Sequence, residues 1–446
     1  MKRKFLQKLC AVGVVVSLLT CFTACEGQKA ASDVSAAAEQ SDAEQTTAAT
    51  QTEYASPSET AAPTGTVYDR TSQYGAAVLK NGDSLTGGTY TATGADESVL
   101  EASGTVKASV TGALLKKTGG DATGAENASF TGVNAAVRAY GNAEVTLADC
   151  EIEATAENAT GVFAYENGVI RISDCVVNVT GGGAGGVQVA GGGTLIGENL
   201  TVTSASKAAI RSDRGGGTLT LTGGSYSSTG SNGCPAIYST ADITVSDALC
   251  ASENSRAVII EGKNTVTLRN CILTGNDQST KEGSVKANVL LYQSASGDAA
   301  DGTSVFTMEG GDMTARSVAM FYCTNTQSVI NLKNAALTLS ADGTLLIVSA
   351  GRWGKDGKNG GDCTLNAEDQ TLTGDITVDA ISSLKLVLTN SSYIGCVTGE
   401  GSVDVTLDEN STWTLAGDSY ISSLSGNTDG IDLNGYALYV NGVMYE

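Results

Sequence analysis

The chain has 446 residues, with 26 Lys and Arg against 48 Asp and Glu, and it contains no histidine. The acidic excess disfavours binding to nucleic acid or anionic lipid headgroups, because like charges repel. The lack of histidine excludes Ser-His-Asp and Cys-His nucleophile chemistry in their usual forms, and it removes the commonest zinc and iron ligand. Any catalysis would therefore depend on carboxylates, Arg, Lys, Tyr or a bound metal.

Residues 1–24 have the pattern of a bacterial lipoprotein signal peptide. Four basic residues within 2–8 precede an apolar run at 11–19, which is too short for the roughly 20 residues that span a bilayer. The following Phe22-Thr23-Ala24-Cys25 resembles a lipobox, so we expect Cys25 to carry the lipid that anchors the chain to the extracellular face of the membrane. An ordinary signal peptide cleaved after Ala24 is the alternative. Cleavage would leave 22 basic against 48 acidic residues, a net charge of −26.

Residues 25–66 consist mainly of Ala, Ser, Thr, Glu and Gln. Such a segment buries too little apolar surface to offset the entropy of ordering it, so it predicts a disordered tether behind the lipid anchor. Residues 67–446 are rich in Gly, Thr, Ser and β-branched residues and predict one folded domain.

The folded part is built from repeats. Six units with alternating apolar positions follow one another at offsets of 23 to 25 residues, at 144–154, 169–179, 193–203, 218–228, 242–252 and 265–275. A period in the low twenties with a side-chain period of 2 indicates a β-solenoid rather than a helical repeat. The sequence therefore predicts an all-β parallel β-helix of about 11 to 13 coils, each with three short strands.

These repeats, together with VTLDENSTWTLAGDSYISSLSG and IDLNGYALYVNG within 405–442, resemble the right-handed parallel β-helix proteins of the pectate-lyase-like superfamily. The chain is most similar to adhesin-like surface lipoproteins of gut anaerobic bacteria. The resemblance implies the fold, but β-helices include lyases, hydrolases, adhesins and inert spacers, so it does not imply one function.

Alternation predicts two columns of outward side chains on one sheet. The candidate ligand-binding residues are those of both columns that offer an aromatic ring or a polar group: Arg138, Tyr140, Phe163, Tyr165, Gln188, Arg211, Asp213, Tyr238, Glu261 and Tyr292. Ile259, Leu290 and Phe321 are expected to face outward among them. Exposed aromatic rings between charged groups suit sugar recognition, whereas plain stacking of large side chains along a sheet is the alternative. Insertions at 116–132 and 275–286 are expected at the edge of this face.

Within AAIRSDRGGG (208–217), the register predicts that Arg211 and Asp213 face outward and that the glycines form a tight corner. Glu261 would lie two coils from Asp213, about 9.6 Å away at the strand spacing. That separation approaches the range of inverting glycosidases, so Arg211, Asp213 and Glu261 are the catalytic candidates. An exposed Arg–Asp pair with no catalytic role is the alternative.

Cys150, Cys175 and Cys271 occupy one repeat position and are expected to be buried thiols, although Cys150 and Cys175 could also form a disulfide. The preceding column contains Asp149, Asp174 and Glu198. Stacked carboxylates suit calcium, but Asp and Asn also favour turns, and no calcium-roll repeat occurs, so we expect no cofactor and no metal site.

The sequence thus favours a monomeric, lipid-anchored, non-enzymatic surface module that binds extracellular glycans or host or microbial surfaces. A polysaccharide lyase or glycoside hydrolase is the first alternative. A passive spacer is the second, and it is favoured if loops cover the outward columns.

Overall fold

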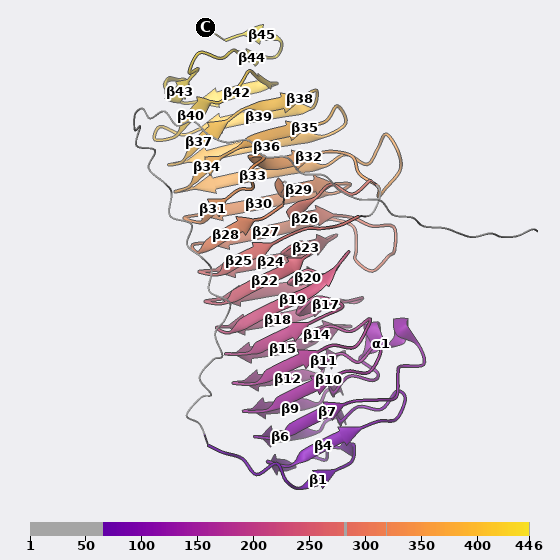
Figure 1. Ribbon diagram of the computed structural model, residues 1–446. Helices are drawn as coiled ribbons and strands as arrows, with labels where there is room; N and C mark the ends of the chain where they lie inside the picture. The colour runs from indigo at the N-terminus through magenta and orange to yellow at the C-terminus, as the bar shows by residue number, and fades with distance from the viewer. Residues whose placement is uncertain (1–65, 281–282, 318, 446) are drawn as a thin grey trace, which may run out of the picture. The chain divides into compact units, whose positions relative to one another are not determined.

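The computed structural model describes residues 66–280, 283–317 and 319–445 (Figure 1). The predicted signal peptide, Cys25 and the tether lie outside the described residues. The described residues belong to one compact unit. Among them, no helix has the length and apolar character needed to cross a membrane.

Three long parallel sheets run along the unit, and successive coils add one strand to each (Figure 1). Sheet A comprises β1 (Gln73–Tyr74), β4 (Thr89–Ala92), β7 (Leu114–Lys117), β10 (Glu151–Ala154), β13 (Val176–Val179), β16 (Thr201–Ser204), β19 (Ser225–Ser231), β22 (Leu249–Asn254), β25 (Ile272–Gly275), β28 (Asp312–Ala315) and β31 (Ala336–Thr338). Sheet B comprises β2 (Ala77–Val78), β5 (Leu100–Gly104), β8 (Val137–Gly141), β11 (Val162–Tyr165), β14 (Val187–Ala190), β17 (Ile210–Ser212), β20 (Ile237–Ser239), β23 (Val258–Glu261), β26 (Ala287–Tyr292), β29 (Ala319–Thr324), β32 (Thr344–Val348), β35 (Asp375–Val378) and β38 (Val397–Gly399).

Sheet C comprises β3 (Ser84–Thr86), β6 (Lys107–Thr111), β9 (Glu144–Ala148), β12 (Val169–Ser173), β15 (Gly193–Glu198), β18 (Gly217–Thr222), β21 (Asp242–Ser246), β24 (Thr265–Arg269), β27 (Thr303–Glu309), β30 (Gln327–Lys333), β33 (Asp362–Glu368), β36 (Ser383–Thr389), β39 (Ser402–Leu407) and β42 (Ser423–Gly426). Smaller sheets at the C-terminal end contain β34 (Thr371–Thr373), β37 (Ser392–Gly395), β40 (Thr412–Leu415) and β43 (Ile431–Asp432), and then β41 (Ser419–Ile421), β44 (Leu438–Val440) and β45 (Val443–Met444). The helices among the described residues are α1 (Ala125–Thr131) and the short 3₁₀ helix η1 (Thr428–Gly430).

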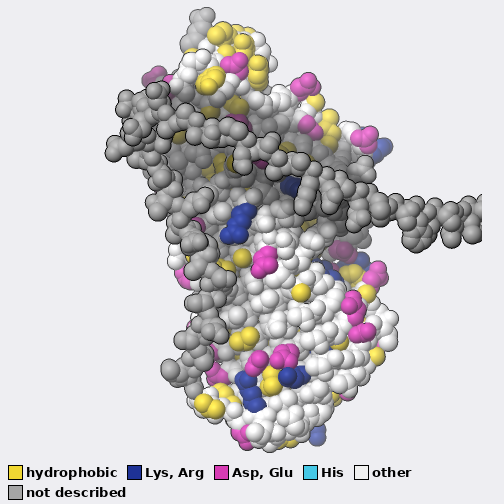
Figure 2. Space-filling view, viewed as in Figure 1, with side chains coloured by type: hydrophobic (Ala, Val, Ile, Leu, Met, Phe, Trp, Pro, Cys, Tyr) yellow, Lys and Arg dark blue, Asp and Glu magenta, His cyan; other side chains and the backbone are white. Residues whose placement is uncertain are grey.

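The protein is a parallel β-helix, as the repeats predict. Sheets A, B and C contain 11, 13 and 14 strands among the described residues, close to the expected 11 to 13 coils. Side-chain alternation explains the packing, because β24 buries Val266 and Leu268 while Thr265 and Thr267 face outward. Figure 2 shows one face of the unit, on which charged side chains are scattered among polar side chains and backbone.

The corner after most sheet C strands has a left-handed backbone. Asp149, Asp174 and Asn199 adopt φ of 54°, 52° and 53° there. Asn and Asp tolerate this conformation better than other residues with side chains, so the corner explains the column without a metal ion. The placement of Glu198 in this column was wrong by one residue, since Asn199 lies at the corner and donates to Asp174 at 3.3 Å.

An inward glycine explains that shift. Gly197 pairs with Ile172 and lies at a core position without a side chain. Leu200 fills the space, because a Cβ on Gly197 would lie 2.9 Å from its Cδ1. Leu200 therefore follows the corner where other coils have Cys, Gly or Ala, and that position does not accept only small side chains.

The expected outward direction of Phe321, in β29, is also wrong. Phe321 pairs with Val289 and lies in the core, whereas Tyr322 pairs with Leu290 and faces outward. The alternation is unreadable in this strand because all six of its residues are buried, on both faces.

Candidate functional site

The register of sheet B brings the predicted columns together. The first column runs through Arg138, Phe163, Gln188, Arg211, Tyr238, Ile259 and Leu290. The second contains Tyr140, Tyr165 and Ala190, and further along it pairs Glu261 with Tyr292.

The structure shows that these columns are largely covered, a point that the sequence left open. Phe163, Gln188, Asp213, Glu261 and Tyr292 are each at most 7% exposed. Five others are partly exposed: Arg138, Tyr140, Tyr165, Arg211 and Tyr238. The direction of the side chains is as predicted, but other parts of the chain cover them. Ligand binding by these residues stays a prediction.

The first cover is α1, which belongs to the 116–132 insertion. Gln188 Nε2 donates to the Ser129 carbonyl at 2.8 Å, and Arg138 Nε donates to the Thr131 carbonyl at 2.9 Å. Gly132 ends the helix with φ of 74°, and its N–H donates to the Ala128 carbonyl at 3.1 Å. The insertion therefore lies over the columns and does not merely border them.

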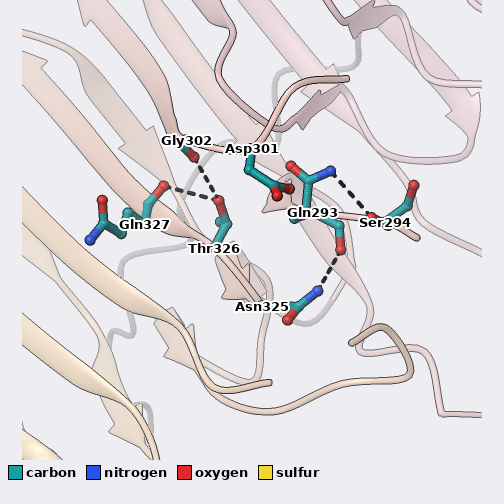
Figure 3. A pocket seen from close by; sticks show the side chains of 7 residues that line it. All are labelled: Gln293, Ser294, Asp301, Gly302, Asn325, Thr326 and Gln327. Atoms are coloured by element: carbon teal, nitrogen blue, oxygen red, sulfur yellow. Dashed lines mark hydrogen bonds between the residues drawn. The ribbon is translucent and has the colours of Figure 1, made fainter. Parts of the chain in front are cut away.

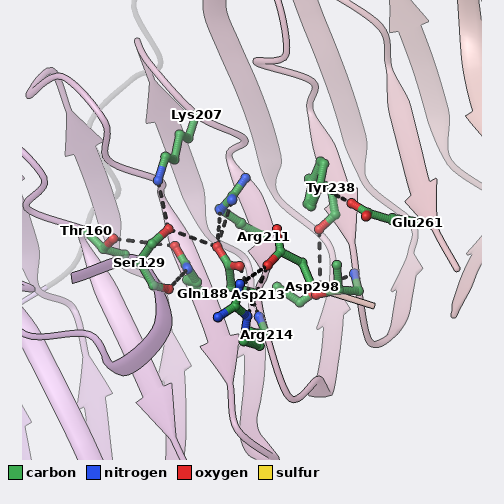
Figure 4. A network of polar contacts seen from close by, with 12 residues as sticks. Ser129, Thr160, Gln188, Lys207, Arg211, Asp213, Arg214, Tyr238, Glu261 and Asp298 are labelled. Carbon is green, nitrogen blue, oxygen red and sulfur yellow. Dashed lines mark hydrogen bonds and ion pairs between the residues drawn. The ribbon is translucent and has the colours of Figure 1, made fainter. Parts of the chain in front are cut away.

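A chain of polar contacts fixes α1 to sheet B (Figure 4). Lys207 Nζ donates to Ser129 Oγ at 2.8 Å, and Ser129 Oγ donates to Asp213 Oδ2 at 2.9 Å. Arg211 Nη2 lies 2.7 Å from the same oxygen, and the Arg214 N–H donates to Asp213 Oδ1 at 3.0 Å. Burial, and then the charge of Arg211, lowers the pKa of Lys207 to about 8.

Arg214 contacts both α1 and the 293–302 loop, which is the second segment that covers the columns. Its guanidinium lies 4.1 Å from the ring centroid of Phe130 in α1, and it pairs with Asp298 of the 293–302 loop at 2.5 Å. The sequence does not predict this role of Arg214, because no pattern within a repeat indicates contacts between segments that lie outside the repeat.

The 293–302 loop is the second cover, and it closes over Glu261 (Figure 4). Glu261 Oε2 accepts hydrogen bonds from the hydroxyls of Tyr238 and Tyr292, the latter at 2.9 Å. Its Oε1 accepts from Ser294 and from Ser296, the latter at 3.3 Å. Burial, assisted by the charge of Glu261, raises the pKa of Tyr238 well above its ordinary value.

The segments after β25 and β32 extend this cover. Trp353 lies against Tyr292, with ring centroids 4.5 Å apart. Asp277, in the 275–286 insertion, forms a buried ion pair with Arg256 at 3.0 Å. Val285 packs against the apolar cluster that contains Ile259. Both predicted insertions therefore help to bury the columns.

The covered carboxylates are occupied by structural contacts. Each oxygen of Asp213 and of Glu261 accepts at least one hydrogen bond from within the chain. A glycosidase acid or nucleophile must instead reach the substrate, with room between the two carboxyl groups. The arrangement can anchor loops, but in this conformation it offers no carboxylate to a sugar.

Within the described ranges, no group of three or more Cys, Asp and Glu is arranged to hold a metal.

The eight cysteines among the described residues are free thiols. The Cys150 N–H donates to Cys175 Sγ at 3.2 Å, and both side chains are buried. The alternative of a Cys150–Cys175 disulfide is therefore not what the structure contains.

A shallow polar groove opens beside the second cover, along the corner between sheets B and C (Figure 3). One part, of about 410 Å³, is lined by Gln293, Ser294, Asp301, Gly302, Asn325, Thr326 and Gln327. The adjoining part, of about 430 Å³, shares Asn325, Thr326 and Gln327 and adds Lys358, Gly360, Gly361, Asp362, Ile381, Ser382 and Ser383. The two parts adjoin at Asn325, Thr326 and Gln327, which line both of them.

Hydrogen bonds hold the walls of this groove in place. Asn325 Nδ2 donates to the Gln293 carbonyl at 2.7 Å, and Ser383 Oγ donates to Asp362 at 2.8 Å. Asn359 Nδ2 donates to the carbonyl of Trp353 at 2.9 Å, which holds the neighbouring loop. The sequence does not predict this groove, because its residues come from four separate coils.

No protein-family model matches the chain, and no curated protein matches it. Beyond the parallel β-helix itself, the resemblance to the pectate-lyase-like superfamily and to surface lipoproteins stays a prediction.

Proposed function

We propose that the chain is an adhesin-like module of the cell surface that binds extracellular glycans and does not cleave them. The observation that supports this proposal is the polar groove at the B/C corner, set on a rigid β-helix beside loops that are fixed by hydrogen bonds. Binding sites in repeat proteins commonly lie where insertions interrupt the coils. We therefore assign glycan binding to the groove, whereas the sequence predicts it for the columns of sheet B.

Retention on immobilised glycans tests the proposal. Residues 66–446 should bind at least one class of glycan on an array of mucin and plant oligosaccharides. The double variant Asp301→Ala/Gln327→Ala should lose at least 10-fold in affinity. The matched control Asp312→Ala/Thr314→Ala changes similar residues on sheet A, away from the groove, and should bind as the unaltered protein does. Retention of none of the glycans, or equal binding by both variants, would count decisively against the proposal.

A passive spacer is the second candidate, because the covered columns are the outcome that favours it. The same array separates the two, since a spacer binds no glycan. An enzyme would be revealed by new reducing ends or unsaturated uronates released from pectin, alginate or mucin glycans.

The surface location depends on Cys25. We infer that Cys25 carries a lipid, so that Cys25→Ala moves the protein from the detergent phase to the aqueous phase. Unchanged partitioning of the variant would contradict the lipid anchor without affecting glycan binding by residues 66–446.

A further inference from the structure

The groove follows the coil axis over several strands. Gly302 precedes β27, and the first residues of the next three sheet C strands in register are Gln327, Asp362 and Ser383. At a strand spacing of about 4.8 Å, three steps span about 14 Å. That length accommodates a short oligosaccharide of two or three rings lying along the groove.

Three groove residues have polar atoms left for a ligand. Within the described part of the chain, the Asp301 carboxylate, Gln327 Nε2 and Lys358 Nζ make no hydrogen bond or ion pair. The carboxylate can accept from two sugar hydroxyls, and the amide and the ammonium can donate to hydroxyl oxygens. The groove thus offers acceptors and donors in the mixture that an uncharged polyol needs.

The charge of the groove is unfavourable for an acidic sugar. Asp301 and Asp362 provide two carboxylates against the single ammonium of Lys358. The whole chain carries a formal charge of −22, which adds a long-range repulsion toward anions. We propose that the groove selects short, uncharged oligosaccharides of two or three hexose units and rejects uronate-containing and sulfated ones. This inference rests on the proposed glycan binding and narrows it to one chemical class.

An array with neutral, uronate-containing and sulfated glycans of equal length tests the selectivity, using residues 66–446, which form a compact unit with its own core. The strongest ligands should be neutral, with at least a 10-fold preference over their acidic counterparts in 20 mM NaCl. The preference should shrink in 300 mM NaCl, because salt screens charges more than about one Debye length apart.

Asp301→Asn then isolates the charge. The variant keeps the shape of the side chain and one acceptor oxygen, and its amide nitrogen can donate to a hydroxyl oxygen. Acidic glycans should therefore gain several-fold in affinity at low salt relative to neutral ones. Asp312→Asn, which removes a carboxylate from sheet A, should leave the ratio unchanged. Tightest binding to acidic glycans, or an unaltered ratio in Asp301→Asn, would overturn the selectivity while leaving glycan binding intact. Absence of binding to all three classes would instead overturn the proposed function itself.

Discussion

Gly132 lies directly against the ring of Phe163. A Cβ at Gly132 would come within 2.5 Å of Phe163 Cγ, and the residue has φ of 74°. This contact joins the end of α1 to the outward face of sheet B, and Phe163 is completely buried as a result. The docking of the insertion therefore depends on a residue that has no side chain.

Gly132→Ala should lower the thermal midpoint and raise hydrogen exchange in α1. The left-handed backbone alone costs an alanine about 1 kcal/mol, and the overlap with Phe163 adds to that cost. Gly104→Ala is the matched control, since Gly104 has φ of 67° but a methyl group there would have no neighbouring atom within 4 Å. Equal losses in the two variants would show that the Phe163 contact contributes nothing.

Ile259→Asp should destabilise the unit by several kcal/mol. Ile259 faces outward from its coil but is only 5% exposed, because the loops that carry Val285 and Trp353 cover it. Placing an unpaired charge there is costly. This reverses the expectation from alternation alone, which predicts that outward residues tolerate charge.

Thr220→Asp is the comparison for this variant. Thr220 also faces outward, but it lies on the uncovered face of sheet C and is exposed. Its thermal midpoint should remain within a few degrees of that of the unaltered protein. A mild effect of Ile259→Asp, similar to that of Thr220→Asp, would contradict the covered arrangement.

Glu261→Gln should destabilise the 293–302 loop, and any loss of glycan binding should accompany that destabilisation, because residues of this loop line the groove. The carboxylate of Glu261 accepts four hydrogen bonds from hydroxyl groups, two on each oxygen. In glutamine, an amide nitrogen replaces one of these oxygens and cannot accept its two hydrogen bonds. The expected loss is about 2 kcal/mol, seen as faster hydrogen exchange in the loop. Glu309→Gln should change stability by less than about 1 kcal/mol, because the Glu309–Arg269 pair is half-exposed. Loss of glycan binding without loss of stability in Glu261→Gln would instead support the ligand-binding role that the sequence predicts for Glu261.

The coils were predictable because each repeat encodes its own strands. Alternation in units such as 265–275 gave the correct register for the sheet C and sheet A strands of those coils, and alternation in the outward columns gave that of sheet B. It failed where a core position lacked a side chain, at Gly197, and where both faces were apolar, as around Phe321.

The covers were not predictable from the repeat, because insertions do not follow its period. One signal was present nevertheless. Outward positions with Phe163, Ile259 and Leu290 make their strands apolar on both faces, which is typical of strands buried on both sides. No pattern in the sequence indicates the groove, because Asp301, Gln327 and Lys358 lie in separate segments that come together only in the folded β-helix.

Lys207 should react with amine reagents at a lower pH than other lysines. Burial lowers its pKa to about 8, from 10.5 for an ordinary lysine, so the nucleophilic neutral amine appears early. Pulse acetylation from pH 6 to 11, read by peptide mass spectrometry, should give a midpoint near pH 8 for Lys207. Lys333 is the internal control, because the hydrogen bond and charge of Glu368 raise its pKa. A Lys207 midpoint above pH 10 would contradict its burial beneath α1.

The same shift predicts how stability depends on pH. Between about pH 8 and 10.5 the unfolded chain keeps the Lys207 proton that the folded chain has lost, so the unfolded state binds more protons. The free energy of unfolding should therefore rise with pH across this window, and the cost of burying the charge is fully present below pH 8. Lys207→Met removes the titrating group, so the difference in thermal midpoint between the variant and the unaltered protein should change across pH 8 to 10.5 and stay constant from pH 6 to 7.5. A difference that is constant over the whole range would show that Lys207 titrates normally in the folded protein.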